Sequence, residues 1–242
     1  MKKHLSLLVV TFIFLFGFIG CDNNNDDNPL SPRDNYYVPV IDPENFVDSI
    51  SNPYWPMIPG TTWNYEGTDN EVTETIDMEV LSETKTIMGV TCTIVRDRVY
   101  EDGSLVEDTY DWYAQDKQGN VWYMGEDSKE MEDGKVVSTE GSWEAGVDGA
   151  QPGIIMWADP FPGIPYRQEY YFEEAEDWAQ VIDILDSLQI GIGTFYHVVK
   201  TKEWTPLEPD FEEHKYYAPN VGLIKEEVIR GGSGVVELKK MN

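Results

Sequence analysis

Few side chains in this chain have the types and spacing that catalysis requires. His197 and His214 lie in segments whose composition predicts strands, and neither has a cysteine or a second histidine at the spacing of a metal site. Ser233 stands in a Gly-rich turn without the second glycine of a nucleophile elbow. Asp and Glu number 45, so that some pair would reach glycosidase separation by accident. We therefore expect no catalytic residue, no metal and no cofactor.

Cys21 is the residue whose surroundings predict a covalent modification. Two lysines precede an apolar run over residues 5–19, the order typical of a signal peptide covering residues 1–20. Residues 18–21 then resemble the lipobox of bacterial lipoproteins, although Phe18 stands where Leu is usual. The resemblance implies cleavage before Cys21 and acylation of the cysteine with diacylglycerol and a fatty acid such as palmitate. A transmembrane helix is the weaker alternative, because the run would be about 22 Å long and the hydrocarbon core is ~30 Å thick.

Residues 21–50 are predicted to be the lipidated cysteine followed by a tether. Asp and Asn fill the positions directly after Cys21 and prolines recur up to Pro43, a composition too polar to bury a core. This acidic start resembles the export signal of surface lipoproteins of the Bacteroidota, whereas Asp after the cysteine favours inner-membrane retention in other bacteria. We expect the cell envelope, with the outer membrane preferred over the inner one and surface exposure left open.

The charge of the mature chain excludes two classes of partner. Loss of the signal peptide removes two lysines and no acid, which leaves 15 basic residues against 45 acidic ones and a formal charge near −30. Nucleic acids and anionic lipid surfaces are bound by clustered Lys and Arg, so both would be repelled. Cys92 is the second of the two cysteines, and once Cys21 is acylated no intrachain disulfide can form.

Residues 51–242 are predicted to form a single β-rich domain. Asp102 and Gly103 between two runs rich in Val, Ile, Thr and Tyr predict a hairpin, because both positions tolerate positive φ. Turn residues recur along the rest of the chain, which indicates an antiparallel curved sheet or open barrel of about ten or more strands. Residues 173–181 leave a short helix open, since their Glu-rich start suits a helix N-terminus.

Two segments, 83–124 and 187–225, have a similar order of turn, apolar strand, acidic turn and aromatic strand, which leaves an internal duplication open. The stretch Tyr216–Lys225 resembles the closing strand of uncharacterised bacterial envelope lipoproteins. Residues 111–123 and 203–207 resemble a more specific set of them. By analogy of fold, the resemblance implies a sheet like those of lipocalins and lipoprotein carriers, and it implies no activity.

Aromatic residues give the remaining functional signal. Tyr110, Trp112 and Ala114 alternate on one face of a predicted strand, and Trp122 and Trp143 lie on or beside other strands. These rings are either core or the lining of a cleft. We expect a non-catalytic module that binds a hydrophobic, glycan or peptide ligand through these four aromatic residues. The alternatives are a partner in the assembly of an envelope complex and, third, a carboxylate-dependent hydrolase.

Overall fold

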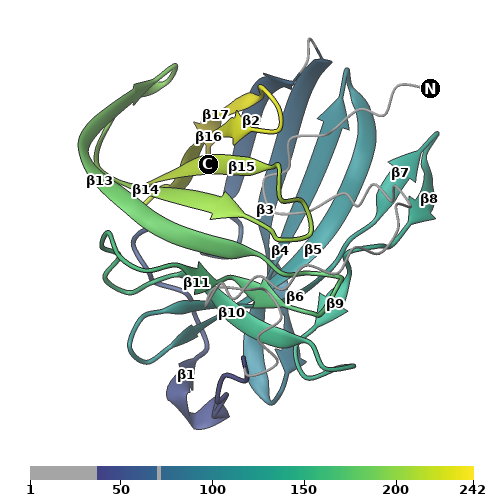
Figure 1. Ribbon diagram of the computed structural model, residues 1–242, viewed down its shortest axis with the longest axis vertical. Helices are drawn as coiled ribbons and strands as arrows, with labels where there is room; N and C mark the ends of the chain where they lie inside the picture. The colour runs from purple at the N-terminus through teal and green to yellow at the C-terminus, as the bar shows by residue number, and fades with distance from the viewer. Residues whose placement is uncertain (1–36, 70–71) are drawn as a thin grey trace, which may run out of the picture.

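The computed structural model describes residues 37–69 and 72–242, and in this part of the chain it is almost entirely β (Figure 1). The 17 strands of the described residues form one sheet. They are β1 Phe46–Val47, β2 Thr62–Asp69, β3 Val72–Ile87, β4 Val90–Glu101, β5 Ser104–Asp116, β6 Val121–Asp127, β7 Glu130–Glu132, β8 Lys135–Ser138, β9 Trp143–Glu144, β10 Gln151–Met156, β11 Tyr166–Arg167, β12 Glu169–Tyr170, β13 Trp178–Ile190, β14 Gly193–Trp204, β15 Glu212–Ala218, β16 Gly222–Arg230 and β17 Val235–Met241. The prediction of a mainly β, antiparallel curved sheet is confirmed.

The sheet curls into a nearly closed barrel. Strands β13 to β17 follow one another by antiparallel pairing, and β17 then pairs with β2, which starts the run β2 to β6. Figure 1 shows β13, β14 and β15 crossing in front of β3, β4 and β5 at a steep angle. Short pairings close the ring. Strand β10 pairs with both β6 and β12, and β11 pairs with β13. The β10–β12 and β11–β13 pairings have two residue pairs each. We call this short-paired region the seam.

The β4–β5 hairpin forms at the predicted turn. Asp102 and Gly103 both have positive φ, 47° and 82°, which a two-residue turn between twisted strands requires. The two segments compared for duplication also fold alike, as the meanders β3-β4-β5 and β13-β14-β15. Thr93 pairs with Tyr113 in the first meander, and Val199 pairs with Tyr217 in the second. The common ancestry of the two meanders stays an interpretation.

No α-helix forms over residues 173–181, so the helix left open there is wrong. The chain makes a tight turn at Glu173, where φ is 62°, and β13 begins at Trp178. Trp178 pairs with Trp204 across the β13–β14 ladder, and the two indole rings stack at 6.3 Å. Pairing with β14 satisfies the backbone that a helix would have satisfied internally. In the described residues the only helix is the 3₁₀ turn Pro43–Asn45.

Ordered contacts start before residue 51, where the sequence placed the start of the domain. Tyr37 donates a hydrogen bond to the Pro152 carbonyl at 2.9 Å, and β1 pairs with β5. Ile50 is buried in the core. Tyr37, β1 and Ile50 therefore contact the barrel, although they lie in the stretch 21–50 that was predicted to be the lipidated cysteine and tether. The rest of that stretch, residues 21–36, lies outside the described part together with the signal peptide.

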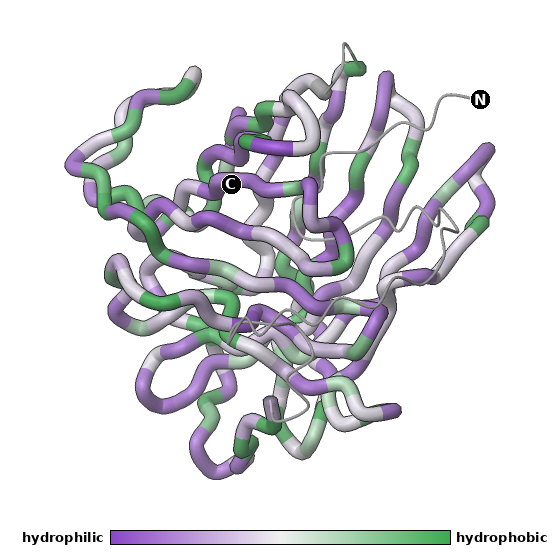
Figure 2. Tube along the Cα trace, in the orientation of Figure 1, coloured by the Kyte–Doolittle hydropathy of each residue, from purple (hydrophilic) through white to green (hydrophobic). Residues whose placement is uncertain are grey.

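The hydropathy of the strands is mixed. Figure 2 shows hydrophilic and hydrophobic residues interspersed along the sheet. The far ends of β13 and β14 extend beyond the rest of the sheet as a two-stranded ribbon (Figure 1). Among the described residues, no helix has both the length and the apolar character needed to cross a membrane.

Candidate functional site

The inner face of the barrel is acidic as well as aromatic. On β5 the residues with period two are Glu107, Thr109, Asp111 and Tyr113, all of which are 2% exposed or less. The same alternation on neighbouring strands brings further carboxyl groups inside. The buried acids whose charges act on one another are Glu74, Asp97, Glu107, Asp111, Glu126, Glu169, Glu203, Glu213 and Glu226. We call this set the inner carboxyl cluster.

Lys215 on β15 neutralises one side of the cluster. Its Nζ lies 3.2 Å from Glu203 Oε2, 2.9 Å from Glu213 Oε1 and 3.8 Å from Glu226 Oε2. Burial by itself would lower the pKa of Lys215, but these three carboxylates raise the pKa well above its usual range. Tyr217 also donates a hydrogen bond to Glu203 Oε1 at 3.0 Å. Lys215 is therefore a fixed positive charge.

Protons neutralise other acids of the cluster, among them Asp111, Glu126 and Glu169. Tyr123 donates a hydrogen bond to Asp111 Oδ1 at 2.7 Å. Burial raises the pKa of Asp111 to about 7 and that of Glu169 to about 8. Burial and then the charge of Glu169 raise the pKa of Glu126 as well. A buried negative charge is costly, so burial favours the protonated form of these acids.

The space inside the cluster is small. A cavity of about 20 Å³ is lined by aromatic and polar side chains, namely Trp55, Tyr123, Ile155, Gln168, Glu169, Asp177, Glu203, Lys215 and Tyr217. This volume holds about one water molecule. Within residues 37–69 and 72–242, no group of three or more His, Cys, Asp or Glu is arranged to hold a metal ion. The cavity beside Glu169, Glu203 and Lys215 is therefore too small for a substrate.

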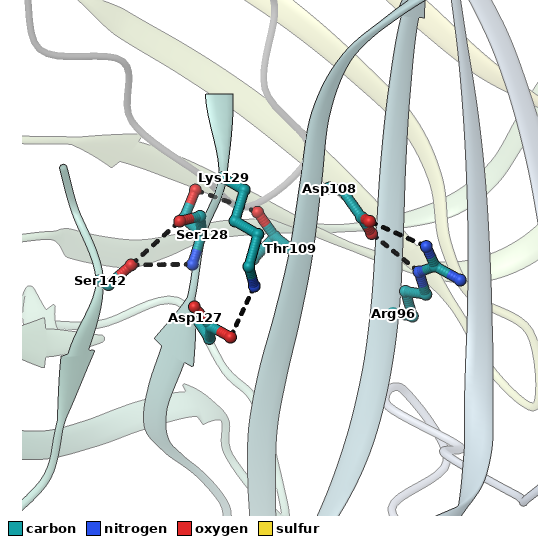
Figure 3. Close-up of polar contacts among 7 residues, drawn as sticks. All are labelled: Arg96, Asp108, Thr109, Asp127, Ser128, Lys129 and Ser142. Atoms are coloured by element: carbon teal, nitrogen blue, oxygen red, sulfur yellow. Dashed lines mark hydrogen bonds and ion pairs between the residues drawn. The ribbon is translucent and has the colours of Figure 1, made fainter. Parts of the chain in front are cut away.

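Polar contacts on both faces of the sheet connect the strands that carry the cluster (Figure 3). Arg96 and Asp108 form a bidentate pair across β4 and β5 at 2.7 and 2.8 Å. On the inner face, Thr109 donates a hydrogen bond to Ser128 Oγ at 3.1 Å, and the Ser128 amide donates to Ser142 Oγ at 2.9 Å. These bonds connect β5 through the end of β6 to the segment before β9.

The four predicted ligand-binding aromatic residues line neither the cavity beside Lys215 nor the larger pocket described below. Tyr110 lies on the outer face between Arg96 and Lys129, whose charged groups are 5.3 Å from its ring. Trp112 is 7% exposed. Trp122 packs on Phe46, and its Nε1 donates to Asp116 at 3.1 Å.

Trp143 is the predicted ligand residue that packs inside the barrel. It lies edge-on against Tyr123 at 5.3 Å and is 4% exposed. Trp112 instead has the Nζ of Lys85 3.2 Å from its ring centroid, which covers its outer side. Both rings therefore have the surroundings of packed residues.

His197, His214 and Ser233, which the sequence did not favour as catalytic residues, lie on different elements of the structure. His214 is on the outer face of β15, where burial lowers its pKa, and His197 is exposed on β14. Ser233 is exposed in the loop between β16 and β17. Burial raises the pKa of the Cys92 thiol to about 12, so this thiol is inert at neutral pH.

A larger pocket lies beside the seam, on the loop that joins β10 to β11. It has a volume of about 710 Å³, and apolar and aromatic side chains make up most of its wall. Its lining residues are Gln118, Asn120, Trp157, Ala158, Asp159, Phe161, Gly163, Ile164, Pro165, Tyr166 and Val181. We call it the loop pocket. Pockets of 300–1,000 Å³ with apolar walls and a few polar groups are typical ligand sites.

The loop of this pocket is anchored at its start. Asn52 Nδ2 donates to the Trp157 carbonyl at 3.0 Å, and the Ala158 amide donates to Asn120 Oδ1 at 3.0 Å. Trp157 meets Tyr166 edge-on at 5.3 Å. The pocket therefore has one wall fixed by hydrogen bonds and aromatic packing.

The other wall is exposed. Phe161 and Ile164 are 69% and 86% exposed, although both are large apolar side chains. The signal that sequence reasoning missed is the run 160–165, in which apolar residues stand between prolines and a glycine and cannot follow a strand pattern. A loop that presents apolar side chains to solvent is typical of a binding site.

Comparisons with known proteins supply no function. No family model matches the chain, and no curated protein matches it. Among solved structures, one similar chain is a protein from Bacteroides fragilis named as an exported protein with a YmcC-like fold, with 14% identity over 78% of this chain and 98% of that one and a TM-score of 0.47. A second, named as a lipoprotein from Parabacteroides distasonis, has 12% identity over 79% of this chain and 99% of that one, with a TM-score of 0.39.

Proposed function

We propose that this chain is a non-catalytic binding module of the cell envelope, anchored through acyl chains on Cys21, that takes a small and mainly apolar molecule in the loop pocket. The observation that carries the proposal is the pocket itself, about 710 Å³ in volume, with Phe161 and Ile164 presented on its open wall. Neither side chain is needed to fill the core, because both are mostly exposed.

The inner carboxyl cluster favours a binding role over hydrolysis. Asp111 and Glu169 have the raised pKa values of candidate acids, but the cavity that Glu169 lines holds about one water. A hydrolase needs its carboxyl pair beside the scissile bond. The proposal therefore places the ligand in the loop pocket and gives the cluster a structural role.

The location that fits this proposal is the outer membrane. The Asp- and Asn-rich start after Cys21 resembles the export signal of surface lipoproteins of the Bacteroidota, and the outer membrane is preferred on that resemblance. The strong negative charge, with 45 acidic residues in the chain, supports a domain that stands clear of anionic headgroups.

The test is binding of a neutral apolar dye, N-phenyl-1-naphthylamine, followed by its fluorescence. The double variant Phe161→Ala, Ile164→Ala should bind about tenfold more weakly, because each lost side chain removes part of its ~1.5–3 kcal/mol burial energy. The matched control is Val136→Ala, Val137→Ala, which removes two exposed side chains from β8. Wild-type protein that does not bind the dye, or equal binding by both double variants, would contradict the proposal.

A partner in envelope assembly is the second candidate, and the projecting β13–β14 ribbon favours it. Ile184, Ile192 and Tyr196 are 40%, 46% and 63% exposed there. A protein partner on this ribbon would co-purify in fixed ratio with wild type and be lost with Tyr196→Asp. The Phe161→Ala, Ile164→Ala variant should keep such a partner, which separates the two candidates.

A further inference from the structure

The loop pocket has an uneven distribution of charge. Its lining contains one ionisable acid, Asp159, and no Lys, Arg or His. The other lining residues with a polar side-chain atom are Gln118, Asn120, Trp157 and Tyr166. Asn120 is already hydrogen-bonded, since it accepts from the Ala158 amide and donates to Asp116 at 2.8 Å. A ligand with a polar end therefore meets one carboxylate and otherwise uncharged amide, phenol and indole groups.

Aromatic rings line the same space. Trp157 and Tyr166 form one wall, and Phe161 lies on the open side. The face of an aromatic ring attracts a cation, and an ammonium group is bound best where rings and a carboxylate are combined. An anionic head group would find no positive partner in the pocket, and the whole chain carries a formal charge of −28.

Asp159 is an exposed side chain, so its carboxylate stays hydrated until a ligand arrives. Burial, and after it the negative charge of Asp159, raises the pKa of Tyr54, so Asp159 lies close enough to act on the Tyr54 hydroxyl. A cation can therefore pair with Asp159 without the free-energy cost of first burying an unpaired carboxylate.

We propose that the ligand of the loop pocket is an amphipathic organic cation, a hydrophobic molecule with an amino or alkylammonium end, in which Asp159 and the rings of the pocket bind the charged end and the apolar wall binds the hydrocarbon. This inference rests on the proposed function of the pocket. It adds the class of ligand, because an apolar pocket alone would bind a neutral or anionic molecule of the same shape equally well.

The experiment compares three probes with one hydrocarbon chain and different charges, namely octylamine, 1-octanol and octanoate. Each is titrated below its micelle concentration and followed by the NMR shifts of the Trp157 and Tyr166 rings at pH 7 and low salt. Wild type should bind octylamine on the order of fivefold more tightly than 1-octanol, the factor expected for two unit charges about 5 Å apart near water. Octanoate should bind most weakly.

Asp159→Asn should bring the affinities for octylamine and 1-octanol close together and leave the affinity for 1-octanol unchanged. The matched control is Asp148→Asn, which removes one exposed charge outside the pocket at a position with φ of 49° that Asn tolerates. The wild-type preference should also shrink in 1 M salt, where the Debye length is about 3 Å.

Equal affinity of wild type for octylamine and 1-octanol would overturn the cationic ligand and leave the apolar pocket standing. An unchanged preference in Asp159→Asn would also overturn it, because the preference would then come from the overall charge. Failure of all three probes to shift the rings would refute the proposed function and the inference with it.

Discussion

The inner carboxyl cluster predicts that this protein loses stability as the pH rises. Burial raises the pKa of Asp111 from 3.8 to about 7 and that of Glu169 from 4.5 to about 8. The folded state thus holds protons that the unfolded chain releases near pH 4, and the free energy of unfolding falls with pH wherever the folded state binds more protons. The stabilisation is complete below about pH 4 and is lost as the pH passes through 7 to 8.

The size of the effect follows from the same values. A rise of the pKa of Asp111 from 3.8 to about 7 corresponds to about 4 kcal/mol. Asp111 and Glu169 interact, so their contributions do not add, and we expect a loss on the order of 4 kcal/mol for the pair. Because small domains are stable by only about 5–15 kcal/mol, such a loss should be easy to measure.

The assay is urea unfolding followed by tryptophan fluorescence at pH 5, 6, 7 and 8. The negative surface also destabilises the fold as pH rises, so a variant must separate the two causes. Asp111→Asn keeps an oxygen for the Tyr123 hydrogen bond and removes the titration. It should flatten the decline between pH 6 and 8, whereas Asp148→Asn at an exposed turn should follow wild type. Stability that rises from pH 5 to 8, or a parallel decline in Asp111→Asn, would refute the reasoning.

Three further predictions concern single residues. Cys21→Ser should abolish acylation and membrane attachment, and continued labelling of this variant with a radioactive fatty acid would contradict the lipoprotein assignment. Trp112→Ala should lower the free energy of unfolding by about 3–5 kcal/mol, because the ring is 7% exposed and covered by Lys85; a loss below 1 kcal/mol in urea would show that Trp112 is not packed as core. Lys215→Met should destabilise the protein more at pH 8 than at pH 5, since protons can replace the lost cation only at low pH; an equal loss at both pH values, measured by thermal melting, would argue against its role as the counter-charge.

Local features of the fold follow directly from the sequence. The Asp102–Gly103 hairpin was predictable because both residues tolerate the positive φ that the turn requires. The antiparallel β class was predictable from alternation and recurring turn residues. The segment 173–181 was ambiguous, because its Glu-rich start suits a helix N-terminus, and pairing of β13 with β14 decided it.

The tertiary structure decided which face of each strand is inside. Alternation with period two separates two faces but does not say which one is buried. On β5 the apolar set of Tyr110 and Trp112 lies on the outer face, while Glu107 and Asp111 lie inside. Acids can occupy the interior only because Lys215 and bound protons neutralise them, and that depends on strands distant in sequence.

The loop pocket was likewise decided by tertiary structure. Its wall combines the turn at 118–120, the loop 157–166 and Val181, and no local pattern links these segments. The sequence by itself determined the signal-peptide pattern at Cys21, the charge and the strand alternation, since each depends on residue types at short spacing. The pocket, the carboxyl cluster and the packed positions of Trp112 and Trp143 depend on which strands become neighbours when the ring closes, and only the folded chain sets those contacts.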